Sequence, residues 1–213
     1  MAGLVEAQAR IAQMGPNGRL NLENLGLIAL PTLPDTVQEL YCKENSLTVL
    51  PVLPSGLKVL ECQENLLSSL PQLPAGLRKL RCSDNQLISL PPLPTTLRTL
   101  WCFNNQLTAL PTLPSGISVI MCSHNQLTSL PQLPTSLTYL DCSNNPFVEP
   151  YRTFVNEYQS NNNLAELRSK ILTTISVPGV SAEGGYRRKT RKRARPLRKT
   201  RKPRKSLRRK ARN

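Results

Sequence analysis

The stretch that decides the fold is residues 80–99, LRCSDNQLISLPPLPTTLRT, because the same twenty-residue pattern recurs along the chain. A cysteine returns every twenty residues, and an asparagine follows each cysteine after three residues. The cysteines are Cys42, Cys62, Cys82, Cys102, Cys122 and Cys142. The asparagines are Asn45, Asn65, Asn85, Asn105, Asn125 and Asn145. So strict a period predicts a solenoid, in which one supersecondary unit stacks on copies of itself.

Each unit contains the signals of a strand, a bend and an extended return. Leu80 and Cys82 flank an outward Arg81, the alternation of a short strand running from Leu80 to Cys82. Asn85 follows at a bend, where its amide can satisfy backbone groups and stack into a ladder with its equivalents. Residues 90–94 contain three prolines in five positions, which excludes a helix. The sequence therefore predicts a mostly β, α/β repeat solenoid of about seven parallel strands with a flat back.

The chain divides into four predicted segments. Residues 1–18 carry a helical apolar stripe and form an N-terminal cap, with contact to a partner or membrane surface as the alternative. Residues 19–149 hold the repeats. Residues 150–178 carry two further helical stripes that we expect to close the last strand, because the end of a solenoid otherwise exposes its core. Residues 179–213 form a linker and a basic tail.

The first repeat departs from the pattern, although its leucines stay in phase. Leu22 stands where later repeats have cysteine, and Leu25 stands where they have asparagine. At the other end, Phe147 replaces the usual leucine. Both changes fall at the ends of the predicted stack.

Charge is distributed unevenly along the chain, whose net charge is +15. Residues 187–213 hold 17 of the 28 Lys and Arg and no acidic residue. The rest of the chain holds the other 11 Lys and Arg and all 13 Asp and Glu, so its net charge is −2. Like charges at this density repel one another and bury little apolar surface, so we expect the tail to be disordered.

Three interpretations of the tail stay open. It can bind the phosphates of a nucleic acid, bind a nuclear-import receptor, or approach an acidic membrane surface. The first two are compatible, and the absence of an adjacent lipid anchor disfavours the third. The candidate nucleic-acid-binding residues are Arg187, Arg188, Lys189, Arg191, Lys192, Arg193, Arg195, Arg198, Lys199, Arg201, Lys202, Arg204, Lys205, Arg208, Arg209 and Lys210.

The cysteines are expected to be buried free thiols. Equivalent side chains on stacked strands lie ~4.8 Å apart, which exceeds the ~3.8 Å between Cβ atoms that a disulfide prefers. Thiols that face the same way in a tight core also do not form the tetrahedron of a soft-metal site. We therefore expect no cofactor and no metal.

Nothing in the sequence indicates secretion or membrane insertion. The first residues lack a basic start followed by a long apolar core, and no stretch approaches the ~18 apolar residues that a membrane span requires. We expect an intracellular protein, in the nucleus or cytoplasm, possibly that of a host cell, and a monomer.

The repeated unit, Leu-Pro-x-Leu-Pro-x-x-Leu-x-x-Leu-x-Cys-x-x-Asn-x-Leu, resembles the leucine-rich repeat family over about residues 20–149. More narrowly, it resembles the short twenty-residue class of bacterial secreted effectors and similar repeats in large DNA viruses of amoebae. The resemblance implies a parallel β horseshoe that binds proteins on its concave face.

Many of those effectors carry a ubiquitin-ligase domain with a Cys-x-Asp motif after the repeats. Here the only such motif, Cys82-Ser83-Asp84, lies inside a repeat, and no cysteine follows Cys142. The resemblance therefore does not imply ligase activity for this chain.

The outward side chains around each strand form the concave face. They include the only tryptophan of the protein, which is surrounded by apolar side chains. Exposed apolar patches of this kind mark contact sites. The candidate protein-binding residues are Tyr41, Arg81, Trp101, Phe103, Val119, Met121 and Tyr139. The alternatives are ordinary variation at solvent positions and packing against the tail or a cap.

Catalysis has little support in the sequence. His124 is the only histidine, and it lies in a turn with no nucleophile arranged around it. No glycine-rich phosphate loop is present. We expect a non-enzymatic, protein-binding module whose tail binds nucleic acid or directs nuclear import. The alternatives are a nucleic-acid packaging or virion protein and, more distantly, an effector that has lost a ligase domain.

Overall fold

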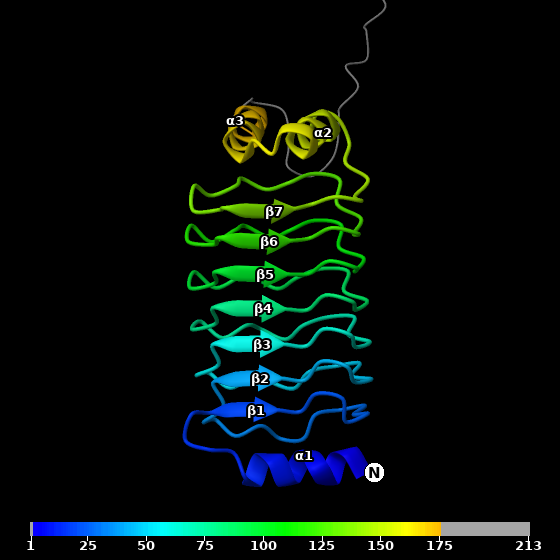
Figure 1. Cartoon of the computed structure of the whole chain (residues 1–213), viewed down its shortest axis with the longest axis vertical. Coiled ribbons are helices and arrows are strands. Elements are labelled where there is room, and N and C mark those ends of the chain that lie inside the picture. The colour runs from blue at the N-terminus through cyan, green and yellow to red at the C-terminus, as the bar shows by residue number, and fades with distance from the viewer. Residues whose placement is uncertain (1, 176–213) are drawn as a thin grey trace, which may run out of the picture.

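The computed structural model describes residues 2–175, which form one parallel sheet with helices at both ends (Figure 1). The elements are α1 (Ala2–Ala12), β1 (Arg19–Asn21), β2 (Glu39–Tyr41), β3 (Val59–Glu61), β4 (Lys79–Arg81), β5 (Thr99–Trp101), β6 (Val119–Met121), β7 (Tyr139–Asp141), α2 (Tyr151–Asn161) and α3 (Leu164–Ile175). The seven strands follow chain order, and each residue pairs with the residue twenty positions later. The predicted solenoid of seven parallel strands is confirmed. The predicted disordered tail lies outside the described residues.

The prediction of the strand limits was wrong by one residue. The strand starts at Lys79 and ends at Arg81, whereas the sequence analysis placed it from Leu80 to Cys82. Cys82 still donates its backbone N–H to the carbonyl of Trp101, at 2.8 Å. The chain then enters the bend, where backbone bonds to the next turn continue outside the strand, as from Asp84 N–H to the Phe103 carbonyl at 3.0 Å.

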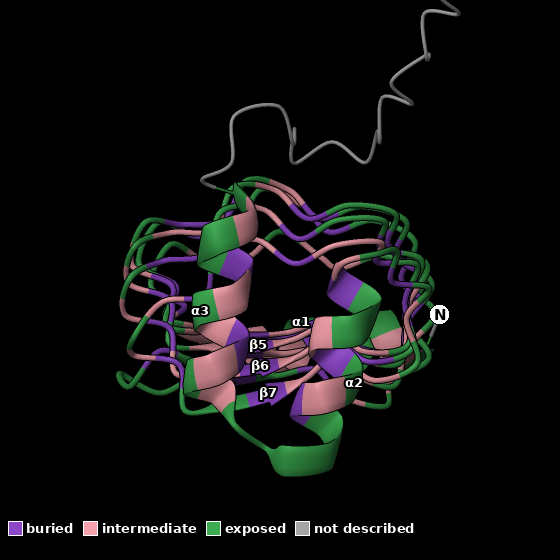
Figure 2. Ribbon diagram, turned by 90° about the horizontal axis from the view of Figure 1, so that it is seen from above, coloured by how far each residue is buried: buried purple, intermediate pink, exposed green. Residues whose placement is uncertain are grey.

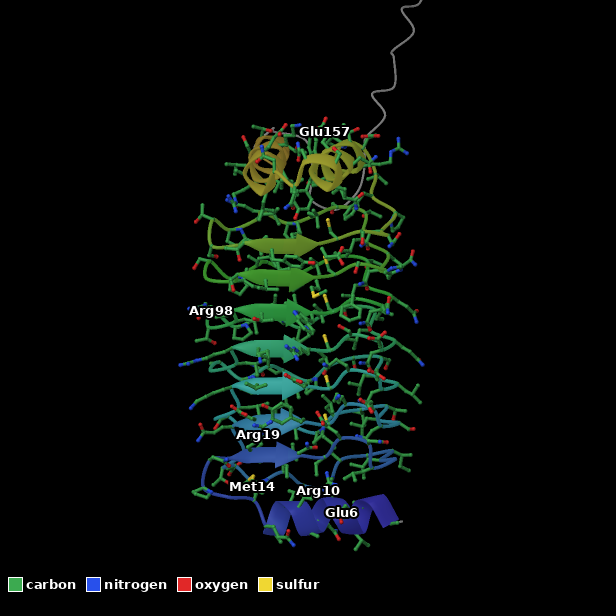
Figure 3. The ribbon with its side chains drawn as sticks, in the orientation of Figure 1. Glu6, Arg10, Met14, Arg19, Arg98 and Glu157 are labelled. Carbon is green, nitrogen blue, oxygen red and sulfur yellow. The ribbon has the colours of Figure 1, made fainter. Side chains whose placement is uncertain are left out.

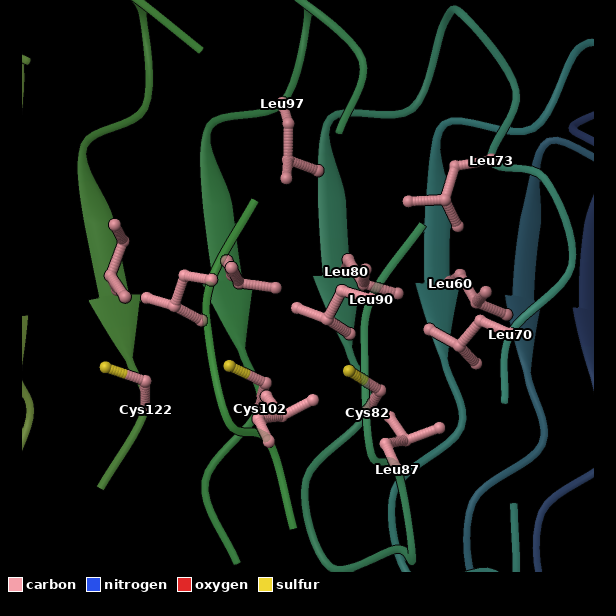
Figure 4. Packing of buried hydrophobic residues seen from close by; sticks show 14 of the residues in the cluster. Leu60, Leu70, Leu73, Leu80, Cys82, Leu87, Leu90, Leu97, Cys102 and Cys122 are labelled. Carbon is pink, nitrogen blue, oxygen red and sulfur yellow. The ribbon is translucent and has the colours of Figure 1, made fainter. Parts of the chain in front are cut away.

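The core is an array of aliphatic rows, each contributed by one position of the unit. Leu80 and Leu100 are fully buried, as are Leu87 and Leu97 on the return path. Burying one such side chain contributes about 1.5–3 kcal/mol. Figure 4 shows Cys82, Cys102 and Cys122 following one another along consecutive strands, next to the leucine rows. Repetition thus builds one continuous core out of units that could not bury their apolar side chains alone.

All six cysteines are buried free thiols. Burial in the apolar core raises the pKa of Cys82 to about 12. The same desolvation raises the pKa of Cys102 and Cys122 well above the usual value. Since the thiolate is the nucleophile and metal ligand, these protonated thiols are suited to packing and not to chemistry.

A ladder of asparagine amides joins successive turns, as predicted. The Asn105 Oδ1 accepts the backbone N–H of Leu87 at 2.9 Å, and its Nδ2 donates to the carbonyl of Cys82 at 3.1 Å. Both partners belong to the preceding turn. The same amide also donates to its own turn, at the carbonyl of Cys102 (3.2 Å). Each asparagine therefore supports the turn before it.

This directionality explains the degenerate first repeat. Leu25 stands at the asparagine position, and no repeat precedes it that an amide could support. The backbone N–H groups of Leu25 and Leu27 are instead bonded by Asn45 Oδ1 of the second turn, at 3.1 and 2.9 Å. Leu25 packs against the core below β1. An apolar residue therefore suits position 25, at the end of the stack, better than an asparagine.

Helices cover both ends of the stack. Below β1, Ala7 of α1 is fully buried and Arg10 Nη1 donates to the carbonyl of Asn21 at 3.2 Å. Above β7, α2 and α3 pack against each other over the end of the stack, and both contain buried residues (Figure 2). The hydroxyl of Tyr158 donates to the carbonyl of Leu140 at 2.8 Å. The expected helices are present at both ends, while the exact segment boundaries stay a prediction.

Asn162 separates α2 from α3. It adopts a left-handed conformation with φ 53°, and its backbone N–H bonds to the carbonyl of Tyr158. Asparagine tolerates this conformation better than most residues, which explains why the asparagine run breaks the helix. None of the helices within residues 2–175 combines the length and apolar character needed to cross a bilayer.

Candidate functional site

The concave face is ordered by the strand register, which places equivalent residues of consecutive turns side by side. Glu61 of β3 pairs with Arg81 of β4, Arg81 with Trp101 of β5, and Trp101 with Met121 of β6. Neighbouring strands lie ~4.8 Å apart, so these side chains contact in sequence. An acid, a base, an aromatic ring and a thioether therefore form one row across four strands.

Arg81 occupies the centre of this row. Its Nη1 lies 3.2 Å from Glu61 Oε1, and its guanidinium carbon lies 3.8 Å from the centre of the Trp101 ring. Glu61 is only 7% exposed and also lies near Lys79 Nζ, at 3.9 Å. A cation over an indole contributes about 0.5–2 kcal/mol, more as it is desolvated. Arg81 is thus held between a buried carboxylate and the tryptophan.

Four polar atoms at this centre are buried without a hydrogen-bond partner among the described residues. They are Gln63 Oε1, Arg81 Nε, Ser83 Oγ and Trp101 Nε1. An unsatisfied buried polar group costs about 1–3 kcal/mol, and each one in a native protein calls for an explanation. Apart from Arg168 Nε in α3, no other such side-chain atom occurs in residues 2–175. The unsatisfied groups therefore concentrate on the concave face.

The predicted apolar patch is more deeply packed than the sequence indicates. Trp101, Phe103, Val119 and Met121 are each half-buried, and only Tyr139 is exposed, at 51%. The patch runs along β5 and β6 and ends at Tyr139 on β7. The structure thus brings these five residues and Arg81 together along β4 to β7, with Phe103 two residues after the end of β5.

Tyr41 lies apart from this group, two strands before Arg81. Its hydroxyl donates to Glu39 Oε2 at 2.7 Å, and the Arg19 guanidinium lies 4.7 Å from its ring centre. Burial, together with the hydrogen bond to Glu39, raises the pKa of Tyr41 to about 12. Tyr41 is already engaged by its own neighbours, so it joins the candidate site only through the shared face.

Sequence reasoning placed three further residues on this face, Glu61, Gln63 and Ser83, but did not include them among the candidate binding residues. The signal was available, because Glu61 and Arg81 occupy the same position in consecutive units. A twenty-residue register places opposite charges at that spacing in direct contact. Treating outward positions as solvent-exposed concealed the pair.

His124 lies on the exposed bend and not at the centre of the face. Its Nε2 lies 2.9 Å from Asn144 Nδ2. Burial raises the pKa of the nearby Asp141, but hydrogen bonds from Ser143 and Ser123 outweigh it and leave the pKa below its usual value. Within residues 2–175, no group of three or more His, Cys, Asp or Glu side chains is arranged to hold a metal ion. The candidate nucleic-acid-binding residues, 187–210, lie outside the described residues.

Comparisons with known proteins agree with the repeat architecture. The family model described as Leucine Rich repeats (2 copies) matches residues 76–115. A Shigella effector LRR domain is 30% identical with a TM-score of 0.64, and the match covers 75% of this chain and 84% of that one. YopM from Yersinia enterocolitica is 41% identical with a TM-score of 0.57, over 58% of this chain and 28% of that one.

This chain therefore spans 28% of the length of YopM, but 84% of the length of the Shigella domain. No curated protein sequence matches it. The repeat pattern, the seven-stranded parallel stack and the likeness to the Shigella domain lead to one conclusion: the chain belongs to the leucine-rich repeat family.

Proposed function

We propose that this chain is a non-enzymatic module that binds a protein partner on its concave face, around Trp101. The observation that carries the proposal is the half-buried indole, whose buried N–H has no partner among the described residues. It lies beside Met121 and below the guanidinium of Arg81. Trp, Met and Arg are enriched in protein interfaces, where a few such residues supply most of the binding energy.

Replacing Trp101 and Met121 by alanine together should abolish capture of the partner from lysate. Both side chains lie on the outer side of the sheet, so we expect circular dichroism to be unchanged. Val52→Ala with Ile88→Ala is the matched control, because Val52 is 90% exposed and Ile88 61% exposed, and neither belongs to a strand. Full capture by the Trp101/Met121 variant would contradict the proposal.

We further propose that residues 187–213 tether the module to nucleic acid or carry it into the nucleus, and that the protein acts inside a cell. The support is the charge: 17 Lys and Arg with no acid, joined to a body of net charge −2. Such a segment binds phosphates through counterion release, with little base preference.

A second candidate function rests on the same 17 charges: packaging of nucleic acid, with the repeats as a structural component. Deletion of residues 187–213 separates the two, measured as capture with and without nuclease. An adaptor keeps its protein partner after the deletion and after nuclease treatment. A packaging protein loses all its associations after the deletion or after nuclease treatment. That result would replace the adaptor proposal.

A further inference from the structure

Charges around the concave face are sorted onto two edges. The basic edge consists of Lys58, Arg78 and Arg98, the residues directly before β3, β4 and β5. Backbone hydrogen bonds of 2.8 Å join Arg78 to Lys58 and Arg98 to Arg78, so the three follow one another along the stack. Arg98 lies on the side where the strands begin (Figure 3).

The acidic edge lies where the strands end. It consists of Glu44, Glu64 and Asp84, each three residues after the end of β2, β3 or β4. Backbone bonds join these bends to the next turn as well, for example from Glu64 N–H to the Ser83 carbonyl at 3.2 Å. Glu44 is paired with Lys43 at 2.9 Å, so the face is positive along one edge and negative along the other chiefly over β3 to β5, at Glu64 and Asp84.

The basic edge is not neutralised by the described residues. Lys58, Arg78 and Arg98 are exposed, and none forms an ion pair within residues 2–175. Lys58 Nζ bonds only to the neutral amide of Gln38, and Arg98 bonds to backbone carbonyls. Exposed like charges at a spacing of ~4.8 Å repel one another, so a bound anion would stabilise all three.

The centre of the face adds to this positive charge. Lys79 and Arg81 share one carboxylate, that of Glu61, at 3.9 and 3.2 Å, which leaves one positive charge in excess. Arg81 Nε and Trp101 Nε1 are N–H donors without an acceptor among the described residues. Both side chains are half-buried, so a small rotation would present either donor to a carboxylate from outside.

We propose that the concave face over β3–β6 binds an acidic segment of its protein partner. The segment lies along the basic edge, and an apolar side chain of it packs against Trp101 and Met121. This inference rests on the proposed protein-binding function and names the chemistry of the partner.

The acidic edge favours a polypeptide over a nucleic acid. Residues 58 and 64 are six positions apart, at most about 20 Å along an extended chain. A double helix laid on this face would bring phosphates close to Glu64 and Asp84, which repel them. A polypeptide can instead place acids on one edge and basic or neutral residues on the other.

The single tryptophan of the chain gives a direct test. We would titrate the full chain with a ten-residue peptide of Glu and Asp containing one central Leu, and follow Trp101 emission. Peptide that binds only to the basic tail gives no signal, because the tail contains no tryptophan. We expect a saturable change in emission that weakens between 0.05 and 0.5 M salt, and no change with the Gln/Asn version of the peptide.

Two variants with opposite expected effects accompany the titration. Arg78→Gln with Arg98→Gln should raise the Kd about tenfold, since two exposed positive charges that form no ion pair are removed. Arg10→Gln with Arg152→Gln removes the same charge from the end helices and should leave the Kd unchanged. Glu61→Gln frees Lys79 and Arg81 and should lower the Kd several-fold, a gain that misfolding cannot produce.

The contrary outcomes are distinct. An unchanged Kd for the Arg78/Arg98 variant, or no emission change with the acidic peptide, would overturn the inference. So would tighter binding of a twenty-nucleotide oligothymidine at Trp101, which would make the occupant a nucleic acid. If lysate capture depends on Trp101 and Met121 but not on Arg78 and Arg98, the protein-binding function stands and only the acidic partner fails.

Discussion

Replacing Asn105 by alanine is expected to lower the free energy of unfolding by about 1–3 kcal/mol, the cost of leaving one buried polar group unpaired. The amide is 8% exposed and bonds the Leu87 N–H and the carbonyls of Cys82 and Cys102. Alanine leaves the Leu87 N–H without a partner in the middle of the stack, while the two carbonyls keep the amides of Asn85 and Asn125. Loss at one turn also weakens its neighbours, since each repeat is stable only through its contacts.

Urea denaturation followed by circular dichroism measures this effect. Asn104→Gly is the matched control, because Asn104 is exposed, has φ 51°, and bonds only Asp84 through its side chain. Glycine adopts that φ without strain, so we expect a change within about 0.5 kcal/mol. Equal losses for the two variants would show that the buried ladder is not what holds the turns together.

Replacing Gly3 by valine is expected to displace α1 from the end of the stack. A Cβ atom at this position would lie 1.9 Å from the Leu25 carbonyl oxygen, far inside van der Waals contact. The oxygen belongs to the backbone, so the helix must move as a whole. Ala7 and the Arg10 bond to Asn21 are then lost together, and the bottom of the first repeat is exposed.

We expect Gly3→Val to cost at least about 3 kcal/mol, the upper end for overpacking a core. It should also produce rapid proteolytic cleavage within residues 2–18. Gly15→Ala is the control, because a Cβ there lies 3.7 Å from the nearest atom, an ordinary contact. If Gly3→Val is as resistant to protease and to urea as Gly15→Ala, α1 does not contribute to the stability of the repeats.

The parts of this structure that the sequence predicted are those in which one residue type recurs at one position. Leu80, Cys82 and Asn85 and their equivalents have the same structural role in every full turn. Repetition alone therefore identified the strand, the core and the ladder. Residue-specific contacts were harder to predict. The sequence gives no direct sign that Arg81 lies over Trp101, because outward side chains differ from turn to turn and their rotamers depend on neighbours.

The physical character of the face around Trp101 could not be predicted from the sequence. The sequence indicated an exposed apolar patch around Trp101, and the structure shows a half-buried indole below a guanidinium paired with Glu61. The register would have revealed Glu61, because a strict period makes residues 61 and 81 neighbours. Burial of the ring could not be predicted, since it depends on how far the Arg81 side chain folds over it.

The asparagine ladder gives the molecule a polarity along its length, so that its two ends are not interchangeable. Every internal unit receives an amide from the unit after it and gives one to the unit before. The last unit receives none, and Phe147 N–H bonds instead to the carbonyl of Asn145 at 2.9 Å. A longer protein of this design would therefore arise by duplication of an interior unit, which preserves every junction. Extension beyond β7 would have to replace the closing helices as well.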